Sequence, residues 1–232
     1  MVDAGLSARQ LEARMSQVGA DLAELLGVIL THEHGDHAGG LKTFLKKKKC
    51  PVYASNGTKD ALEPGLATAE WRAFEAGARV EIGGFQIETF PVPHDAAEPI
   101  GMRITAGSVR IGVVSDLGYV TRLVVERLKG CTALLLEANY DEAMLREEER
   151  RPWAVKQRIS ARHGHLSNGA AAKLVEEVAG PELRDLFLGH ISEDCNRPEL
   201  ARKAIEEALV RAGRKGVRVH ETCADEVGER HG

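Results

Sequence analysis

The sequence lacks any cysteine pattern that would suggest a disulfide framework or a zinc ribbon. Its four cysteines, Cys50, Cys131, Cys195 and Cys223, form no C-x-x-C pair. Such isolated cysteines are typical of free thiols in a reducing compartment. We therefore expect a cytoplasmic protein without structural disulfides.

Long apolar runs and a strong excess of one charge are also missing. The longest apolar stretches, such as residues 25–30 and 132–136, have the length of a strand, and no secretory signal opens the chain. The net charge of −4 does not by itself indicate a nucleic-acid or membrane partner, although basic residues can still gather on one face. With 232 residues, 43% of them hydrophobic, the chain is expected to form a single domain over residues 1–232.

Strand-like and helix-like segments alternate along the chain, which predicts an α/β layered fold. A Gly83-Gly84 pair predicts a hairpin, and the tail at residues 229–232 is expected to be loose. Strands are expected at 27–31, 51–54, 79–82, 85–92, 100–105, 110–115, 132–138, 183–189 and 217–220, and helices at 7–18, 38–49, 121–129, 167–179 and 198–212, with mixed helix and turn at 61–75.

The segment Thr31-His32-Glu33-His34-Gly35-Asp36-His37 concentrates four ligand-type residues directly after an apolar strand. Imidazoles and a carboxylate are ligands for borderline divalent metals. Four ligands at this spacing are too many for one tetrahedral ion that keeps an open position. They suggest two neighbouring ions that need further ligands from elsewhere in the chain.

Further ligand-type residues follow three other expected strands. They are His94, Asp116 and His190, each at or just beyond a strand end. Any one of them alone would be read as a polar strand terminus, but together with the histidine segment they predict a metal site.

This order of motifs resembles the metallo-β-lactamase superfamily. The resemblance implies a four-layer αββα sandwich with two divalent ions, for which Zn, Mn and Fe all remain candidates. It places His32, His34 and His94 on one ion and Asp36, His37 and His190 on the other, with Asp116 bridging them. Two such ions can lower the pKa of a shared water and stabilise charge on an ester-like bond under attack.

Several later motifs resemble the YycJ/WalJ (VicX) group of this superfamily, over nearly the whole chain. They are His94-Asp95-Ala96-Ala97-Glu98-Pro99, Ser115-Asp116-Leu117-Gly118, Glu137-Ala138-Asn139-Tyr140-Asp141, Gly164-His165-Leu166-Ser167-Asn168 and Asn196-Arg197-Pro198. The resemblance implies an exonuclease that degrades DNA from its 5′ end, with Asp36 and His165 as catalytic residues. His165 matches the position of a non-ligand histidine in phosphodiesterases of the superfamily and would bind the scissile phosphate or protonate the leaving oxygen.

Other residues are expected to support the site or to contact nucleic acid. Asp3 and Glu137 would steady the metal ligands from behind. The helix start at Ser167 and Asn168 would offer N–H groups to an anion. Trp153, Lys156 and Arg158 lie in a basic segment that could track a backbone and stack a base, with a charged surface and a docking role for the tryptophan as the equal alternative.

Relatives of this group begin with two or three strands before the turn at Asp3, so we expect the chain to lack its first N-terminal strands. The short spacing from His94 to Asp116 leaves no room for the arm of many tRNase Z enzymes, and that from Asp116 to His190 leaves none for a β-CASP domain. Two alternatives to a nuclease remain at this point. One is a carboxyl-ester or thioester hydrolase of the glyoxalase or lactonase type, and the other is a regulatory protein that keeps its metals without turnover.

Overall fold

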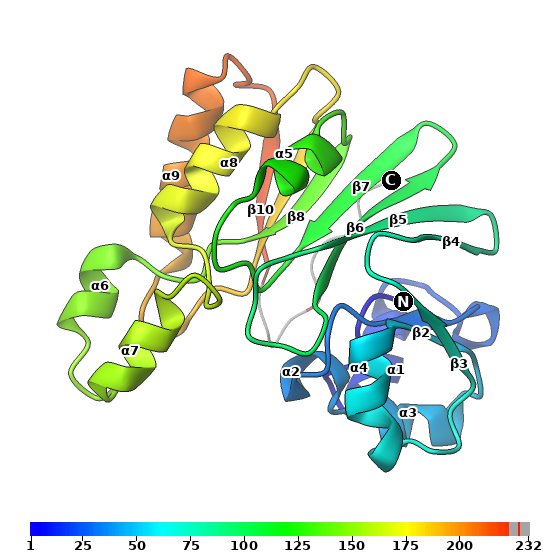
Figure 1. The fold of residues 1–232 in the computed structure, drawn as a ribbon. Coiled ribbons are helices and arrows are strands. Elements are labelled where there is room, and N and C mark those ends of the chain that lie inside the picture. Colours follow the sequence, from blue (N-terminus) through cyan, green and yellow to red (C-terminus); the bar gives the residue numbers. More distant parts are fainter. Residues whose placement is uncertain (223–226, 228–232) are drawn as a thin grey trace. The chain divides into compact units, whose positions relative to one another are not determined.

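The computed structural model describes residues 1–222 and residue 227, and it divides into two compact units (Figure 1). Unit 1 holds Met1–Pro91 and Ala96–Ile100, and unit 2 holds Val92–Asp95 and residues 101–222. The expectation of a single domain stays a prediction. The thiol expected at Cys223 and the loose tail expected at residues 229–232 lie outside the described residues.

Unit 1 is built on a parallel three-stranded sheet in the order β1-β2-β3, followed by the antiparallel hairpin of β4 and β5. Apolar side chains of the strands and of α3 form its core, among them Val28, Leu30, Leu41 and Phe44. The strands are β1 (Val28–Ile29), β2 (Val52–Ser55), β3 (Trp71–Phe74), β4 (Arg79–Ile82) and β5 (Phe85–Pro91); the helices are α1 (Ala8–Gln17), η1 (Leu22–Glu24), α2 (Gly35–Ala38), α3 (Leu41–Lys47), α4 (Asn56–Leu62) and η2 (Glu63–Gly65).

Two local predictions in unit 1 are confirmed. Ser7 caps α1 in a capping box with Gln10, as a serine before a helical apolar pattern predicts. The hairpin turns at Gly83 and Gly84, whose φ angles of +55° and +87° favour glycine.

Unit 2 contains five strands in the order β10-β9-β8-β7-β6, in which only β6 and β7 pair antiparallel. Figure 1 shows α8 and α9 side by side along the strands β8 to β10. The strands are β6 (Ile100–Ala106), β7 (Val109–Val114), β8 (Ala133–Glu137), β9 (Asp185–Gly189) and β10 (Arg218–Glu221); the helices are α5 (Arg122–Leu128), α6 (Glu142–Glu147), α7 (Trp153–Ile159), α8 (Asn168–Val178) and α9 (Pro198–Arg211).

The register of unit 2 brings several chemically active residues to one edge of its sheet. Val114 pairs with Leu136, and Glu137 pairs with Gly189, so β7, β8 and β9 end at the same level. The residues at or just beyond these ends are Asp116, Glu137 and His190. The carboxyl ends of parallel strands are where open α/β sheets carry their sites.

The secondary structure differs from expectation in a few places. The helix expected at 38–49 begins only at Leu41, as α3, because the N–H of Gly40 donates to the carbonyl of Ala4. The stretch expected as mixed helix and turn at 61–75 ends in strand β3, and helices α4, α6 and α7 were not expected. Within the described residues, no helix is both long and apolar enough to cross a membrane.

Candidate metal centre

The histidine segment of unit 1 follows the short buried strand β1 and enters helix α2 at Gly35, with His34 as the N-cap. His32 and His37 are buried, whereas the carboxylate of Asp36 is exposed. Nε2 of His32 lies 3.1 Å from Nδ1 of His34, and Nε2 of His37 lies 3.4 Å from a carboxylate oxygen of Asp36. The unit thus brings together all four ligand-type residues that the sequence indicates in this segment.

Asp3 fixes this segment from behind through both carboxylate oxygens. Oδ1 accepts the backbone N–H of Thr31 at 2.7 Å, and Oδ2 accepts the Thr31 hydroxyl at 2.9 Å and Nδ1 of His37 at 2.8 Å. The turn that carries Asp3 packs directly on the segment, because a Cβ on Gly5 would lie 1.6 Å from the carbonyl oxygen of Asp36. Only glycine allows this close approach.

In unit 2, the carboxylate of Glu137 is the centre of a hydrogen-bond network at the sheet edge. Oε1 accepts the backbone N–H groups of Leu117 at 2.9 Å and Leu166 at 2.7 Å. Oε2 accepts the N–H of Asp116 at 3.1 Å and lies 3.2 Å from Nδ1 of both His165 and His190. Burial acts to raise the pKa of Glu137, but the hydrogen bonds from the two histidines outweigh it and hold that pKa below its usual value.

Asp116, His165 and His190 lie close together around this carboxylate. One oxygen of Asp116 is 3.5 Å from Nδ1 of His165 and 3.5 Å from Nδ1 of His190. Ligand-type atoms of these three residues and Glu137 all lie within 4.8 Å of one another. Since Glu137 already accepts five hydrogen bonds, it is better suited to hold the histidines than to bind an ion itself.

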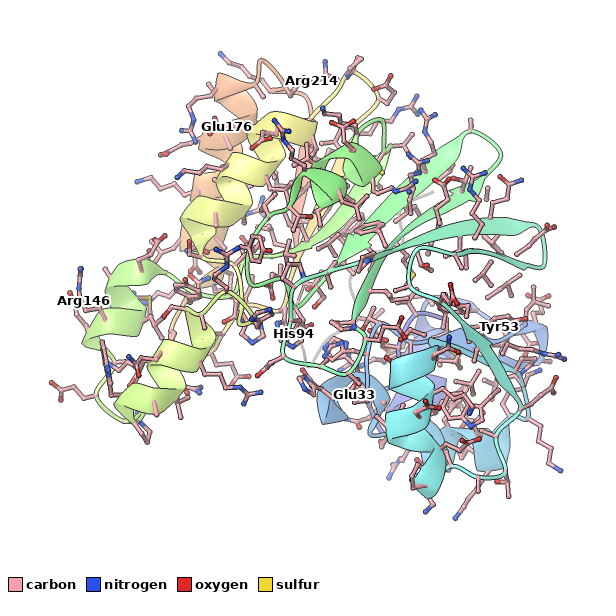
Figure 2. The ribbon with its side chains drawn as sticks, viewed as in Figure 1. Glu33, Tyr53, His94, Arg146, Glu176 and Arg214 are labelled. Atoms are coloured by element: carbon pink, nitrogen blue, oxygen red, sulfur yellow. The ribbon has the colours of Figure 1, made fainter. Side chains whose placement is uncertain are left out.

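His94 lies in the connection that precedes β6 (Figure 2). Its Nδ1 donates to the carbonyl of Gly164 at 3.0 Å, so Nε2 carries the ring's lone pair. Nε2 lies 3.7 Å from a carboxylate oxygen of Asp116. Burial lowers the pKa of His94 against the opposing effects of Asp116 and the Gly164 carbonyl, which keeps the ring neutral at neutral pH.

The donor set fits divalent metal ions. In four of the predicted ligand histidines, Nδ1 faces a protein oxygen: Thr31 for His32, Asp3 for His37, Gly164 for His94 and Glu137 for His190. A metal-binding histidine almost always donates its second ring N–H to such a partner, which fixes the tautomer and presents the other nitrogen to the ion. These imidazoles and the carboxylates of Asp36 and Asp116 match the ligand types of zinc, manganese and iron.

Ser167 and Asn168 have partners within unit 2. The hydroxyl of Ser167 caps α8 by accepting the N–H of Ala170. The N–H of Asn168 donates to Tyr140, and its buried amide forms a reciprocal pair with Asn196 at 2.9 and 2.8 Å. These contacts anchor the loop that carries His165. They occupy the polar groups of Ser167 and Asn168 that a substrate would otherwise contact.

The three residues expected to contact nucleic acid lie on α7. Trp153 is 67% exposed, which argues against a role in docking this segment onto the core. Nζ of Lys156 donates to the carbonyl of Arg146 at 2.8 Å. Nε of Arg158 donates to Asp95 at 2.5 Å, an ion pair that raises the pKa of the arginine and ties α7 to the residue after His94.

Sequence reasoning missed two supports of the site. Asn139 donates to the carbonyl of His190 at 2.9 Å, and the carbonyl of Gly164 orients His94. Asn139 follows the end of β8 by two residues, so the strand-end argument that found Asp116 could have found it. No sequence pattern could have indicated the role of the Gly164 carbonyl, because every residue has a backbone carbonyl.

Comparisons with known proteins show the family and the fold of this chain. A family model described as beta-lactamase superfamily domain matches residues 1–191. The chain is 35% identical to exodeoxyribonuclease YycJ of Bacillus anthracis over 92% of this chain and 81% of the relative, and 30% identical to exodeoxyribonuclease WalJ of Streptococcus pneumoniae over 91% and 80%. The crystal structure of the metallo-beta-lactamase fold protein YhfI from Bacillus subtilis matches with a TM-score of 0.70 at 18% identity, covering 95% of this chain and 83% of that one. The predicted fold is thereby confirmed.

Proposed function

This chain belongs to the metallo-β-lactamase superfamily, in the group of YycJ and WalJ, and from that premise we propose that it is a metal-dependent exonuclease that degrades DNA from the 5′ end. The proposed metal dependence rests on one observation. In four of the predicted ligand histidines, Nδ1 faces a protein oxygen, which leaves Nε2 available to a metal ion. We propose DNA as the substrate because the two relatives compared above are both named exodeoxyribonucleases.

We propose that seven residues hold two divalent ions. His32, His34 and His94 serve one ion, Asp36, His37 and His190 serve the other, and Asp116 serves both, as the resemblance of the motifs implies. Bound divalent ions supply an activated water and positive charge at the attacked phosphorus. The protein's own contribution is to keep the imidazoles neutral and oriented, as the lowered pKa of His94 and the carboxylates of Asp3 and Glu137 indicate.

Asp36 and His165 carry the proposed proton and phosphate chemistry. Asp36 has an exposed carboxylate beside His37, and in this proposal it would orient the water that attacks the phosphorus. Nδ1 of His165 is fixed on Glu137, and its side chain remains 21% exposed. Its other ring nitrogen can therefore bind a phosphate oxygen or protonate the leaving oxygen.

Among the expected substrate contacts, Trp153 and Lys156 are retained in this proposal. Arg158 forms an ion pair with Asp95 and so orients that carboxylate beside His94. Only the guanidinium N–H groups outside this ion pair can contact the substrate. Ser167 and Asn168 hold the His165 loop rather than the substrate.

The test is a comparison of substrates on one metal-supplemented preparation. Duplexes of DNA and of RNA, labelled at either the 5′ or the 3′ end, are incubated with Zn, Mn or Fe beside a thioester and a lactone. We expect release of nucleotides from the 5′ end of DNA, and two ions per chain by elemental analysis. Turnover of the thioester or lactone without nucleotide release under any metal would contradict the proposal.

A His165→Ala variant tests the role of the non-ligand histidine. We expect kcat to fall about 100-fold or more while both ions stay bound, because a positioned proton donor contributes roughly 10²–10⁴-fold. His163→Ala is the matched control, since His163 is exposed and contributes only its backbone carbonyl, to Asp95. Full activity of the His165 variant with both metals bound would refute the assignment.

A further inference from the structure

A cavity of about 460 Å³ lies between α6 and α7 of unit 2, and nothing in the metal site described above uses it. Its volume falls within the range of about 300–1,000 Å³ that is typical of small-ligand sites. The α7 residues that line it follow the spacing of one helical face. The lining residues are Tyr140, Glu142, Leu145, Arg146, Trp153, Lys156, Gln157 and Ser160.

The side chain of Trp153 lines this cavity on its solvent-exposed side. It is the most exposed large hydrophobic side chain of the described residues, at 67%, whereas Tyr140 and Leu145 on the inner side are buried. Tryptophan is enriched at binding interfaces, because it combines a large apolar ring with a polar N–H group. The cavity therefore offers a flat ring that a planar ligand can stack upon.

Two cations line the same cavity, Arg146 on α6 (Figure 2) and Lys156 on α7. Neither forms an ion pair with a carboxylate anywhere in residues 1–222, and Lys156 uses one of its donors on the carbonyl of Arg146. The neighbouring arginines differ, because Arg150 and Arg151 pair with Asp194 and Arg158 pairs with Asp95. The cavity is thus lined by two cations without a carboxylate partner and by one carboxylate residue, Glu142, which leaves a positive balance of charge.

We propose that this cavity binds one unpaired base of single-stranded DNA, stacked on Trp153, with the adjacent phosphates neutralised by Arg146 and Lys156. An aromatic face accepts any base, and cations beside it track the backbone, which is how proteins hold single strands without sequence preference. An apolar peptide would gain nothing from the two uncompensated cations. The inference rests on the proposed nuclease function and deepens it: the enzyme grips an unpaired stretch of its DNA and favours ends that carry a single-stranded overhang.

Trp153 fluorescence gives a direct readout in the metal-free protein, where no hydrolysis intervenes. The chain has two tryptophans, so a Trp71→Phe background leaves Trp153 as the only reporter. We expect oligothymidylate to quench its emission to saturation and blunt duplex DNA to quench it far less. Trp153→Ala should weaken binding of the single strand, followed by anisotropy of a labelled oligonucleotide, about 5- to 150-fold, the range for one stacked base.

Charge variants and a control on the same helix complete the test. Arg146→Gln and Lys156→Gln should each reduce the slope of log K against log salt concentration by about 0.7, the value for one phosphate contact on a single strand. Val155→Ala changes an exposed residue of α7 that does not line the cavity, and it should bind oligothymidylate like the parent. Thermal melting of each variant shows that α6 and α7 remain folded.

The outcomes separate this inference from the nuclease proposal. If the metal-loaded Trp153→Ala variant degrades overhang-bearing DNA with unchanged KM and metal-free binding is unaltered, the cavity has no role in binding DNA and the inference is wrong. The same holds if an amphipathic peptide, but no oligonucleotide, alters the emission of Trp153. If the parent binds oligothymidylate through Trp153 yet hydrolyses no nucleic acid with any metal, the cavity assignment stands and the nuclease proposal fails.

Discussion

Replacement of Glu137 by glutamine should destabilise the metal-free protein more than an isosteric change usually does. The carboxylate is completely buried and accepts five hydrogen bonds, three from backbone N–H groups and two from imidazoles. In glutamine one oxygen becomes an NH₂ group, which cannot accept. The smaller loss places this group at the Oε2 position. A neutral imidazole can take the tautomer whose Nδ1 accepts from it, so only the N–H of Asp116 loses its acceptor.

The expected magnitude follows from this one contact. A buried donor left without an acceptor costs about 1–3 kcal/mol, which is the loss expected for the variant. A loss of this size is a large part of the roughly 5–15 kcal/mol that stabilises a typical domain. In urea denaturation with a slope of about 2 kcal/mol/M, 3 kcal/mol lowers the midpoint by about 1.5 M with an unchanged slope.

Glu33→Gln serves as the matched control. Among the described residues, Glu33 accepts one hydrogen bond, from the N–H of Ala97 at 2.7 Å, and a glutamine can keep that bond through its amide oxygen. We expect this variant to lose less than about 1 kcal/mol. An equally small loss for Glu137→Gln would refute the view that Glu137 holds the sheet edge together.

The difference between the parent and Glu137→Gln should also depend on pH in a defined direction. The pKa of Glu137 in the folded protein lies below its ordinary value of 4.5, since the hydrogen bonds from His165 and His190 outweigh burial. A carboxylate with a lowered pKa contributes stability that is present above its unfolded pKa and is lost as the pH falls through its folded pKa. The urea midpoints of the two proteins should therefore stay apart from pH 7 down to 4.5 and approach each other only below it. Convergence already between pH 7 and 5 would contradict this assignment.

Three further predictions concern packing, metal affinity and thiol reactivity. Gly5→Ala places a Cβ 1.6 Å from the carbonyl oxygen of Asp36, so the melting temperature should fall by about 6 °C or more. A shift under about 2 °C would be evidence against this close approach. Asn139→Ala removes the donor to the carbonyl of His190 and should weaken metal binding about 10- to 100-fold, measured in competition with a chromophoric chelator. An unchanged metal affinity would contradict this role of Asn139. Burial raises the pKa of Cys131 to about 11, so iodoacetamide at pH 8 should alkylate it only after unfolding, and mass spectrometry showing native labelling would count against its burial.

The sequence predicts those features of the fold that depend on local patterns. The alternation of strands and helices, the Gly83-Gly84 turn and the Ser7 cap each follow from a few adjacent residues, and the structure has all of them. Because parallel strands end together, residues that follow different strands could be expected to meet. In unit 2 this holds for Asp116 and His190, which lie on either side of Glu137.

Features that depend on pairing between distant residues were not predicted. Strand β3 has no clear alternation of apolar and polar residues, and it forms because Val52 and its neighbours in β2 provide a parallel partner. Helix α7 is tied down by the pair of Arg158 and Asp95, which are 63 residues apart in the chain. No local pattern indicates such a partner. The same limit applies to Asn168, whose place at a helix start predicts a substrate contact although its amide pairs with Asn196.

Backbone conformation adds a physical reason why the strand-end residues belong to a site. Within the described residues, only three non-glycine residues have positive φ: Asp3 at 56°, Asp116 at 56° and His190 at 53°. Each such conformation costs on the order of 1 kcal/mol or more, least for aspartate and more for histidine. Hydrogen bonds hold each of these residues. Asp3 accepts from Thr31 and His37, the N–H of Asp116 donates to Glu137, and Asn139 donates to the carbonyl of His190. Aspartate tolerates this conformation, and Asp3 and Asp116 use it to reach Thr31 and Glu137. At His190 the greater cost is best explained by the ring nitrogen that the imidazole presents.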